Sequence, residues 1–109
     1  MALFPCNVGG GGTQYASGTF TSTTTNTTKC TCGFQPTYIA VFDPVTRNCN
    51  IYNADYNSSQ YMYGSANGTS LKNLPSTGTN ELASIDNDGF TMNKWGSAAG
   101  RTVYWFAVG

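Results

Sequence analysis

The stretch Leu82-Ala83-Ser84-Ile85-Asp86-Asn87-Asp88-Gly89-Phe90-Thr91-Met92-Asn93-Lys94 predicts a β-hairpin. Residues 82–86 and 90–94 have strand character, and an Asp-Gly pair lies between them. We expect glycine at this point because it accepts the positive φ that a tight hairpin turn demands. The segment Asp86-Asn87-Asp88-Gly89 also resembles a calcium loop superficially. It lacks the later ligands and the closing Glu, so we prefer the hairpin interpretation.

Short strand-like segments continue on both sides of this hairpin. Residues 29–34 alternate polar with apolar, so Cys30, Cys32 and Phe34 should share one face of a strand. The run Tyr38–Phe42 is almost continuously apolar, which predicts a central strand covered on both faces. Further candidates are residues 15–20, 50–54, 60–64 and 102–109, and the irregular connection 65–79 has room for one more strand around residues 70–74. Short strands without helical periodicity predict an all-β, antiparallel β-sandwich.

The chain of 109 residues has the size of one domain. Its first part, residues 1–13, combines an apolar segment containing Leu3-Phe4-Pro5 with four consecutive glycines, Gly9 to Gly12. Four glycines cannot hold a regular element, so we expect a hinge or surface loop there. The predicted organisation is therefore an N-terminal apolar segment and Gly-rich linker over residues 1–13, followed by the sandwich over residues 14–109.

The composition is poor in charge and rich in aromatic residues. Five basic and five acidic residues make up 9% of the chain and cancel to zero net charge. Nucleic acids and anionic membranes require clustered Lys and Arg, so we expect neither as a partner. No run reaches the roughly 20 apolar residues of a membrane helix, and no export signal is visible, which predicts a soluble protein without membrane insertion. A neutral, aromatic-rich surface favours association with other subunits.

Catalytic chemistry is weakly represented. The chain contains no histidine, which excludes Ser-His-Asp and Cys-His mechanisms. Carboxylate pairs for a glycosidase could come from the four Asp and one Glu, but Asp86 and Asp88 already have a turn role. We therefore expect no enzyme and no cofactor. The cysteines are interpreted as reduced, buried thiols, with two disulfides or an all-thiolate zinc site as alternatives; they are Cys6, Cys30, Cys32 and Cys49.

Aromatic side chains next to polar loop residues are the positive signal for binding. Amphipathic rings beside Asn and Asp are a usual means of gripping sugars or proteins, although the same rings can simply cover the core or a subunit interface. A ligand site would combine such rings with hydrogen-bonding groups near the predicted loops. The candidate ligand-binding residues are Asp55, Tyr56, Tyr61, Tyr63, Trp95 and Arg101.

The end of the chain resembles the H-type lectin family. Residues 88–93, then Trp95, then residues 103–109 match that family's "Gly-Phe" strand and its final strand of the form aromatic-Trp-x-Ala-aliphatic-Gly. Residues 17–20 and 34–41 look like its opening strands. The resemblance implies an antiparallel sandwich of about six strands, commonly assembled as a homotrimer, that binds terminal sugars near subunit boundaries. The family's sugar contacts do not map residue by residue onto this chain, so sugar binding is implied by analogy.

The whole chain is also similar to distal tail-fibre domains and small proteins of bacteriophages and prophages. The recurring stretches are Gly33 to Ile39, Ile51 to Tyr56, and Ile85 to Phe90. This resemblance implies a virion protein of the tail, assembled in the bacterial cytoplasm, that recognises host surface carbohydrate as a homotrimer. The alternative is a structural tail or head decoration subunit that contacts other virion proteins and has no ligand of its own. An enzyme degrading cell-wall polysaccharide is the third hypothesis.

Overall fold

The protein is all β in the part of the chain that the structure describes. A computed structural model describes residues 14–96 and 99–109, and in these residues nine strands form and no helix. The strands are β1 (Tyr15–Thr21), β2 (Thr28–Thr31), β3 (Tyr38–Asp43), β4 (Asn48–Asn53), β5 (Gln60–Ser65), β6 (Gly68–Asn73), β7 (Leu82–Asp86), β8 (Gly89–Met92) and β9 (Thr102–Val108). The expected N-terminal segment and linker, residues 1–13, lie outside the described residues.

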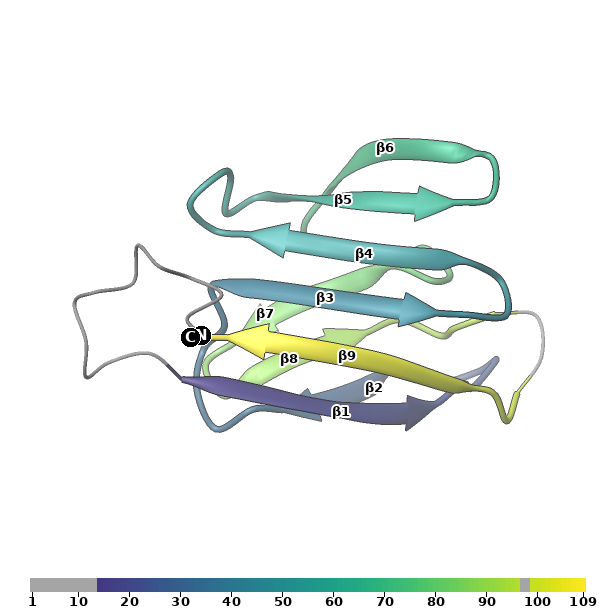
Figure 1. Cartoon of the computed structure of the whole chain (residues 1–109), viewed down its shortest axis with the longest axis horizontal. Coiled ribbons are helices and arrows are strands. Elements are labelled where there is room, and N and C mark those ends of the chain that lie inside the picture. The colour runs from purple at the N-terminus through teal and green to yellow at the C-terminus, as the bar shows by residue number, and fades with distance from the viewer. Residues whose placement is uncertain (1–13, 97–98) are drawn as a thin grey trace, which may run out of the picture.

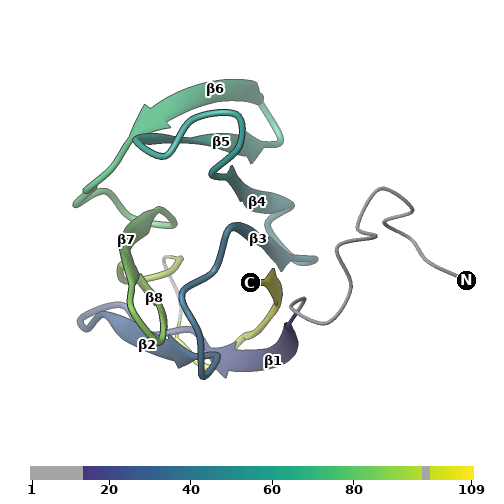
Figure 2. The same cartoon turned by 90° about the vertical axis from the view of Figure 1, so that its left-hand side faces the viewer.

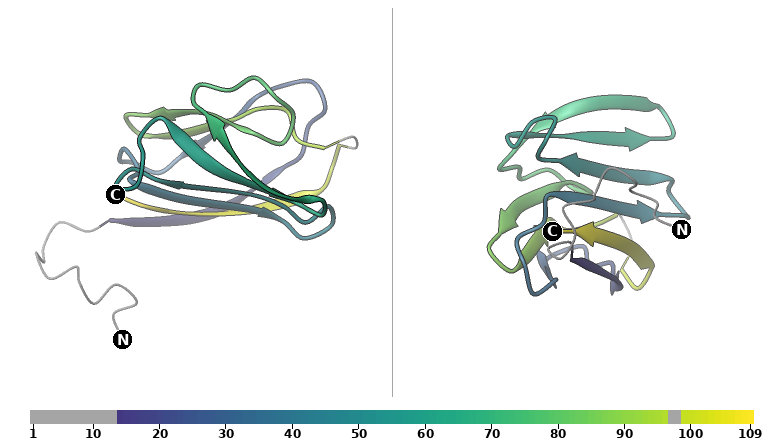
Figure 3. Two further views of the ribbon diagram at one scale, coloured as in Figure 1. Left: turned by 90° about the horizontal axis from the view of Figure 1, so that it is seen from above. Right: turned by 60° about the vertical axis from the view of Figure 1, so that its left-hand side comes forward.

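The strands form two antiparallel sheets packed face to face. The larger sheet has the order β1-β9-β3-β4-β5-β6, and the smaller one has the order β2-β8-β7. The smaller sheet lies behind β1, β9 and β3, while β5 and β6 extend beyond it (Figure 1). Figures 2 and 3 show the two layers from the side and from above. The predicted all-β antiparallel sandwich is confirmed, and its larger sheet alone contains six strands.

The core lies between the two sheets and is built from alternate residues of each strand. On β3, Ile39 and Val41 point inward and are fully buried. The rings of Phe90 and Trp105 meet edge to face with centroids 5.3 Å apart, a favourable arrangement for two aromatic side chains. The buried apolar residues are Phe20, Cys30, Ile39, Val41, Tyr52, Tyr61, Leu82, Phe90, Met92, Trp95, Val103 and Ala107.

The predicted hairpin is confirmed as β7 and β8, joined by the two-residue turn Asn87-Asp88. The reason we gave for Gly89 is wrong, because its φ is not in the positive region. Gly89 instead pairs across to β2, where a Cβ would collide with the carbonyl oxygen of Cys30. Glycine is therefore needed here for the close approach of two strands.

Two strand predictions need correction. The strand predicted over residues 29–34 ends at Thr31, because Gly33 takes a φ of 86° and turns the chain. Cys32 and Phe34 still pack against the core beyond the end of that strand. The prediction that β3 is covered on both faces is wrong for the single chain, because its outward-pointing Phe42 is 47% exposed.

The described cysteines are free thiols. Cys30 is buried, and Cys32 and Cys49 are half-buried; Cys6 lies outside the described residues. No group of three potential metal ligands occurs in the part of the chain that the structure describes. That part also contains no helix long and apolar enough to cross a membrane.

Candidate functional site

Two of the predicted ligand residues are core residues. Tyr61 is 2% exposed and Trp95 is 0% exposed, so neither ring has a face for a ligand. Tyr61 points inward from β5, and its hydroxyl lies 3.5 Å from the Ser76 Oγ. Burial raises the pKa of Tyr61 above its ordinary value. The prediction of accessible rings at these two positions is wrong.

Asp55 and Tyr56 are exposed and adjacent, on the turn between β4 and β5. Tyr56 is 68% exposed, and the turn is held by Asn53, whose Oδ1 accepts a hydrogen bond of 2.9 Å from the Asp55 backbone N–H. Tyr63 is half-buried on the inner side of the large sheet. Its hydroxyl accepts a hydrogen bond of 3.0 Å from Asn48 Nδ2 at the far end of β4. The structure therefore does not bring Tyr63 together with Asp55 and Tyr56.

Trp95 and Arg101 meet on a buried carboxylate, Asp43, at the end of β3. Asp43 Oδ2 accepts hydrogen bonds from Trp95 Nε1 at 2.8 Å and from Arg101 Nε and Nη2, both at 3.3 Å. Its Oδ1 accepts from the backbone N–H groups of Val45 at 2.9 Å and Thr46 at 3.4 Å. Burial alone would raise the pKa of Asp43, but the hydrogen bonds from Trp95, Val45 and Thr46 hold that pKa below its ordinary value. Trp95 is thus fully enclosed and the Arg101 side chain is 17% exposed, and both help to position the β3–β4 turn through Asp43.

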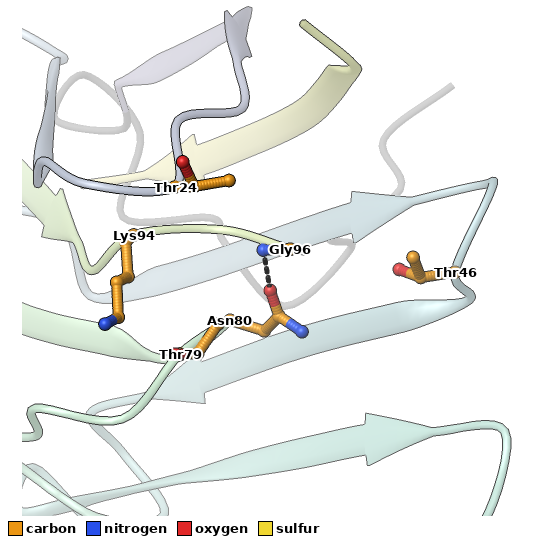
Figure 4. A pocket seen from close by; sticks show the side chains of 6 residues that line it. All are labelled: Thr24, Thr46, Thr79, Asn80, Lys94 and Gly96. Carbon is orange, nitrogen blue, oxygen red and sulfur yellow. Dashed lines mark hydrogen bonds between the residues drawn. The ribbon is translucent and has the colours of Figure 1, made fainter. Parts of the chain in front are cut away.

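An open pocket of about 480 Å³ lies at this same end of the sandwich, which we call the end pocket (Figure 4). The β3–β4 turn belongs to it, and Figure 1 shows that turn at the opposite end of β4 from the turn carrying Asp55 and Tyr56. Four separate segments of the chain contribute to its wall. The lining residues are Thr24, Thr46, Thr79, Asn80, Lys94 and Gly96.

Asn80 ties these segments together. Its backbone has a φ of 62°, a left-handed conformation that Asn tolerates better than most residues. Its backbone N–H donates to the carbonyl of Lys94 at 2.9 Å, and its own carbonyl accepts from Asn50 Nδ2 at 2.9 Å. Its side-chain Oδ1 accepts a short hydrogen bond from the backbone N–H of Gly96, as Figure 4 shows. The loop before β7 is therefore held to both β4 and the segment after β8.

Five of the six residues that line the end pocket have polar side chains, and one of these side chains is charged. Lys94 is exposed and forms no ion pair within residues 14–96 and 99–109. Asp43 is the carboxylate nearest to Thr46 in the sequence. Its Oδ2 already forms an ion pair with Arg101 Nη2 at 3.3 Å. Three Thr hydroxyls supply both donors and acceptors, whereas the Asn80 amide already accepts from the Gly96 N–H and donates to Asn48 Oδ1. The arrangement suits a ligand rich in hydroxyl groups, with a preference for one that carries negative charge near Lys94.

The described residues that line the end pocket include neither a carboxylate nor an aromatic side chain. None of its six lining residues is a carboxylate, so it does not hold the acid pair that most glycosidases use. None is aromatic either, so ring stacking does not contribute. Our sequence interpretation missed these residues because Thr24 and Thr79 lie in stretches that read only as polar loops. Only the folding of the chain brings them together.

Comparison of the chain with protein-family models, with curated proteins and with solved structures found no match. The resemblance to H-type lectins and to phage tail domains therefore rests on the sequence stretches quoted above.

Proposed function

We propose that this protein is an adhesion module that binds carbohydrate in the end pocket and does not cleave it. The observation that carries the proposal is the lining of that pocket: hydroxyl, amide and ammonium groups from four segments, without a carboxylate. Sugars present many hydroxyl groups, and side chains that both donate and accept hydrogen bonds are suited to them. The volume of about 480 Å³ lies within the range of roughly 300–1,000 Å³ that is usual for small-molecule sites.

The rigidity of the pocket wall supports binding. Asp43 fixes the turn that carries Thr46, and Asn80 fixes the loop that carries Thr79 against the backbone of Lys94 and Gly96. A wall that is already ordered loses little conformational entropy when a ligand binds. The pocket is therefore organised before a sugar enters it.

The proposed setting is a phage tail, where the protein acts as a homotrimer that recognises carbohydrate on the host surface. This part of the proposal rests on the resemblance of the sequence to tail-fibre domains. An open, polar pocket gives a weak single site, and several sites on one particle raise the overall avidity without new contacts. A three-fold axis parallel to the strands would place all three end pockets on the same side of the assembly.

Glycan binding by the wild type and by Lys94→Gln tests the proposal. Lys29→Gln is the matched control, because Lys29 is also a surface lysine but pairs with Asp86 and Asp88 on the small sheet. We expect the wild type and Lys29→Gln to bind the same acidic glycans on an array. Lys94→Gln should bind them about ten- to one-hundred-fold more weakly, the usual effect of losing a hydrogen bond to a charged group. Equal binding by Lys94→Gln and wild type, or no glycan bound by the wild type, would count against the end pocket.

A further inference from the structure

One face of the six-stranded sheet has no cover in the single chain. We call it the outer face: the side of the sheet turned away from β2, β8 and β7, which faces the viewer in Figure 1. Strand register aligns one row of apolar side chains across it from β9 to β6. The row consists of Phe106, Ala40, Ile51, Met62 and Leu71.

Large apolar side chains on this face are open to water. Phe42 is 47% exposed, its cross-strand neighbour Tyr104 is 50% exposed, and Leu71 is 52% exposed. Antiparallel sheets with one solvated face normally place polar side chains there. A contiguous apolar patch on a small protein usually marks a surface that another molecule covers.

The outer face also carries no charged residue, although all ten charged residues of the chain lie in the described part. Three of the ten, Lys29 and its two acidic partners, belong to the small sheet and its hairpin. Four form two ion pairs on the inner side of the large sheet, Arg101–Asp43 and Lys72–Glu81. The remaining three lie in turns and loops: Arg47, Asp55 and Lys94.

We propose that the outer face is the interface with a second copy of this chain. Two uncharged sheet faces can pack on each other without removing any charge from water. Removing a charge from water costs several kcal/mol per ion, so this contact avoids a large penalty. A partner with a charged surface would lose its hydration and find no opposite charge here. The large sheet is curved (Figure 2), and its pleated outer face can pack on another sheet at the usual separation of about 10 Å, with side chains of the two faces interdigitating. The inference goes beyond the proposed function and does not rest on its homotrimer, because two sheet faces that pack on each other join the copies in pairs.

The size of the face agrees with a stable contact. Six strands at a spacing of about 4.8 Å extend roughly 29 Å, and six residues along a strand extend roughly 20 Å. The projected area is on the order of 600 Å², and the relief of the side chains adds to it. A standard interface buries about 800 Å² on each partner. Full coverage of the outer face would thus bury an area near the lower end of the range for stable interfaces.

Native mass measured by light scattering tests the interface. We expect the wild type at about 100 μM, well above the dissociation constants of ordinary stable interfaces, to have at least twice the 11.6 kDa mass of one chain. Phe42→Lys should reduce it to the mass of one chain, because a lysine on this face would become a buried, unpaired charge. Leu71→Lys is a second variant from the other side of the face. Val45→Lys is the matched control, since Val45 is 69% exposed on the β3–β4 turn and lies off the face.

The outcomes separate this interface from the proposed function. Both face variants should keep the circular dichroism spectrum of the wild type, because the replaced side chains are half exposed. A wild type that is monomeric, or face variants that keep the wild-type mass, would overturn the interface while leaving Lys94-dependent glycan binding intact. A wild-type dimer that both variants dissociate would support the interface and reject the homotrimer. A wild type that self-associates as expected but binds no glycan would count against the proposed function and would leave the interface standing.

Discussion

Replacing Asp43 with asparagine should destabilise the protein substantially. The two oxygens of this buried carboxylate accept hydrogen bonds from five nitrogen atoms, and all five are donors. Oδ1 receives the backbone N–H groups of Val45 and Thr46, and Oδ2 receives Trp95 Nε1 and two nitrogens of Arg101. An asparagine can offer an oxygen on only one side. Its amide NH₂ must face donors on the other side, which leaves buried donors without an acceptor.

The magnitude follows from the groups that lose their partner. A hydrogen bond to a charged group contributes about 1.5–3 kcal/mol, and removing one partner of a fully buried ion pair costs about 3–5 kcal/mol. The side chain of Arg101 is 17% exposed, so some water can reach it and the lower part of that range applies. We expect Asp43→Asn to lower the free energy of unfolding by about 2–4 kcal/mol. For a domain of this size, that corresponds to a decrease in Tm of roughly 10–25 °C.

Urea unfolding at pH 7 measures this loss, with Asp55→Asn as the control. Asp55→Asn is the same chemical change at an exposed turn, where we expect the free energy of unfolding to change by no more than about 0.5 kcal/mol. The measurements should be repeated at several protein concentrations, because self-association adds to apparent stability. Equal urea midpoints for Asp43→Asn and Asp55→Asn would refute the reasoning.

The pH dependence of the same comparison has a definite sign. The pKa of Asp43 is lower in the folded protein than its ordinary value, because its hydrogen bonds outweigh the effect of burial. A carboxylate with a lowered pKa stabilises the fold at pH values above its unfolded pKa of about 3.9, and this contribution is lost as the pH falls through the folded pKa. The difference between wild type and Asp43→Asn should therefore be complete at pH 7 and shrink below about pH 4.

Two further predictions concern the small sheet. Gly89→Ala should lower the free energy of unfolding by about 2 kcal/mol or more, because its Cβ would collide with the Cys30 carbonyl, whereas Gly33→Ala, with open space around it and a φ of 86°, should cost only about 1 kcal/mol. Thermal unfolding compares them, and equal decreases in Tm would contradict the steric role of Gly89. Burial raises the pKa of the Cys30 thiol to about 12, so on the order of one thiol in ten thousand is ionised at pH 8. Peptide mapping after iodoacetamide treatment should find Cys30 unmodified in native protein and modified in urea, and equal rates in both states would contradict its burial.

Local patterns in the sequence predict where the strands lie better than they predict which strands pair with each other. The hairpin of β7 and β8 depends on thirteen neighbouring residues, and alternation within them is visible directly. The pairing of β1 with β9 places Tyr15 opposite Val108, although these two residues are separated by nearly the full length of the chain. Nothing in either segment specifies the other, so the sheet order emerges only from packing of the whole core.

The candidate site was harder to predict, for two physical reasons. The pocket residues Thr24, Thr46 and Lys94 lie in separate loops, and a loop shows no periodicity that reports its neighbours in space. The aromatic residues misled us because rings occur on both faces of the large sheet. Tyr61 on β5 points inward and is 2% exposed, whereas Tyr104 on β9 points outward and is 50% exposed.

The near-continuous apolar run of β3 connects these failures with the outer face. A run such as Tyr38–Phe42 is typical of a strand covered on both sides, and a single chain covers only the side of Ile39 and Val41. If a second copy packs on the outer face, the side of Phe42 is covered as well, and the run no longer conflicts with its surroundings. The same packing would account for the charge content of 9%, because a chain that covers both faces of its largest sheet has less solvated surface on which to place charges. Under this proposal the apolar run, the low charge and the uncovered sheet face have one cause, burial by association, and the native mass of Phe42→Lys tests that cause.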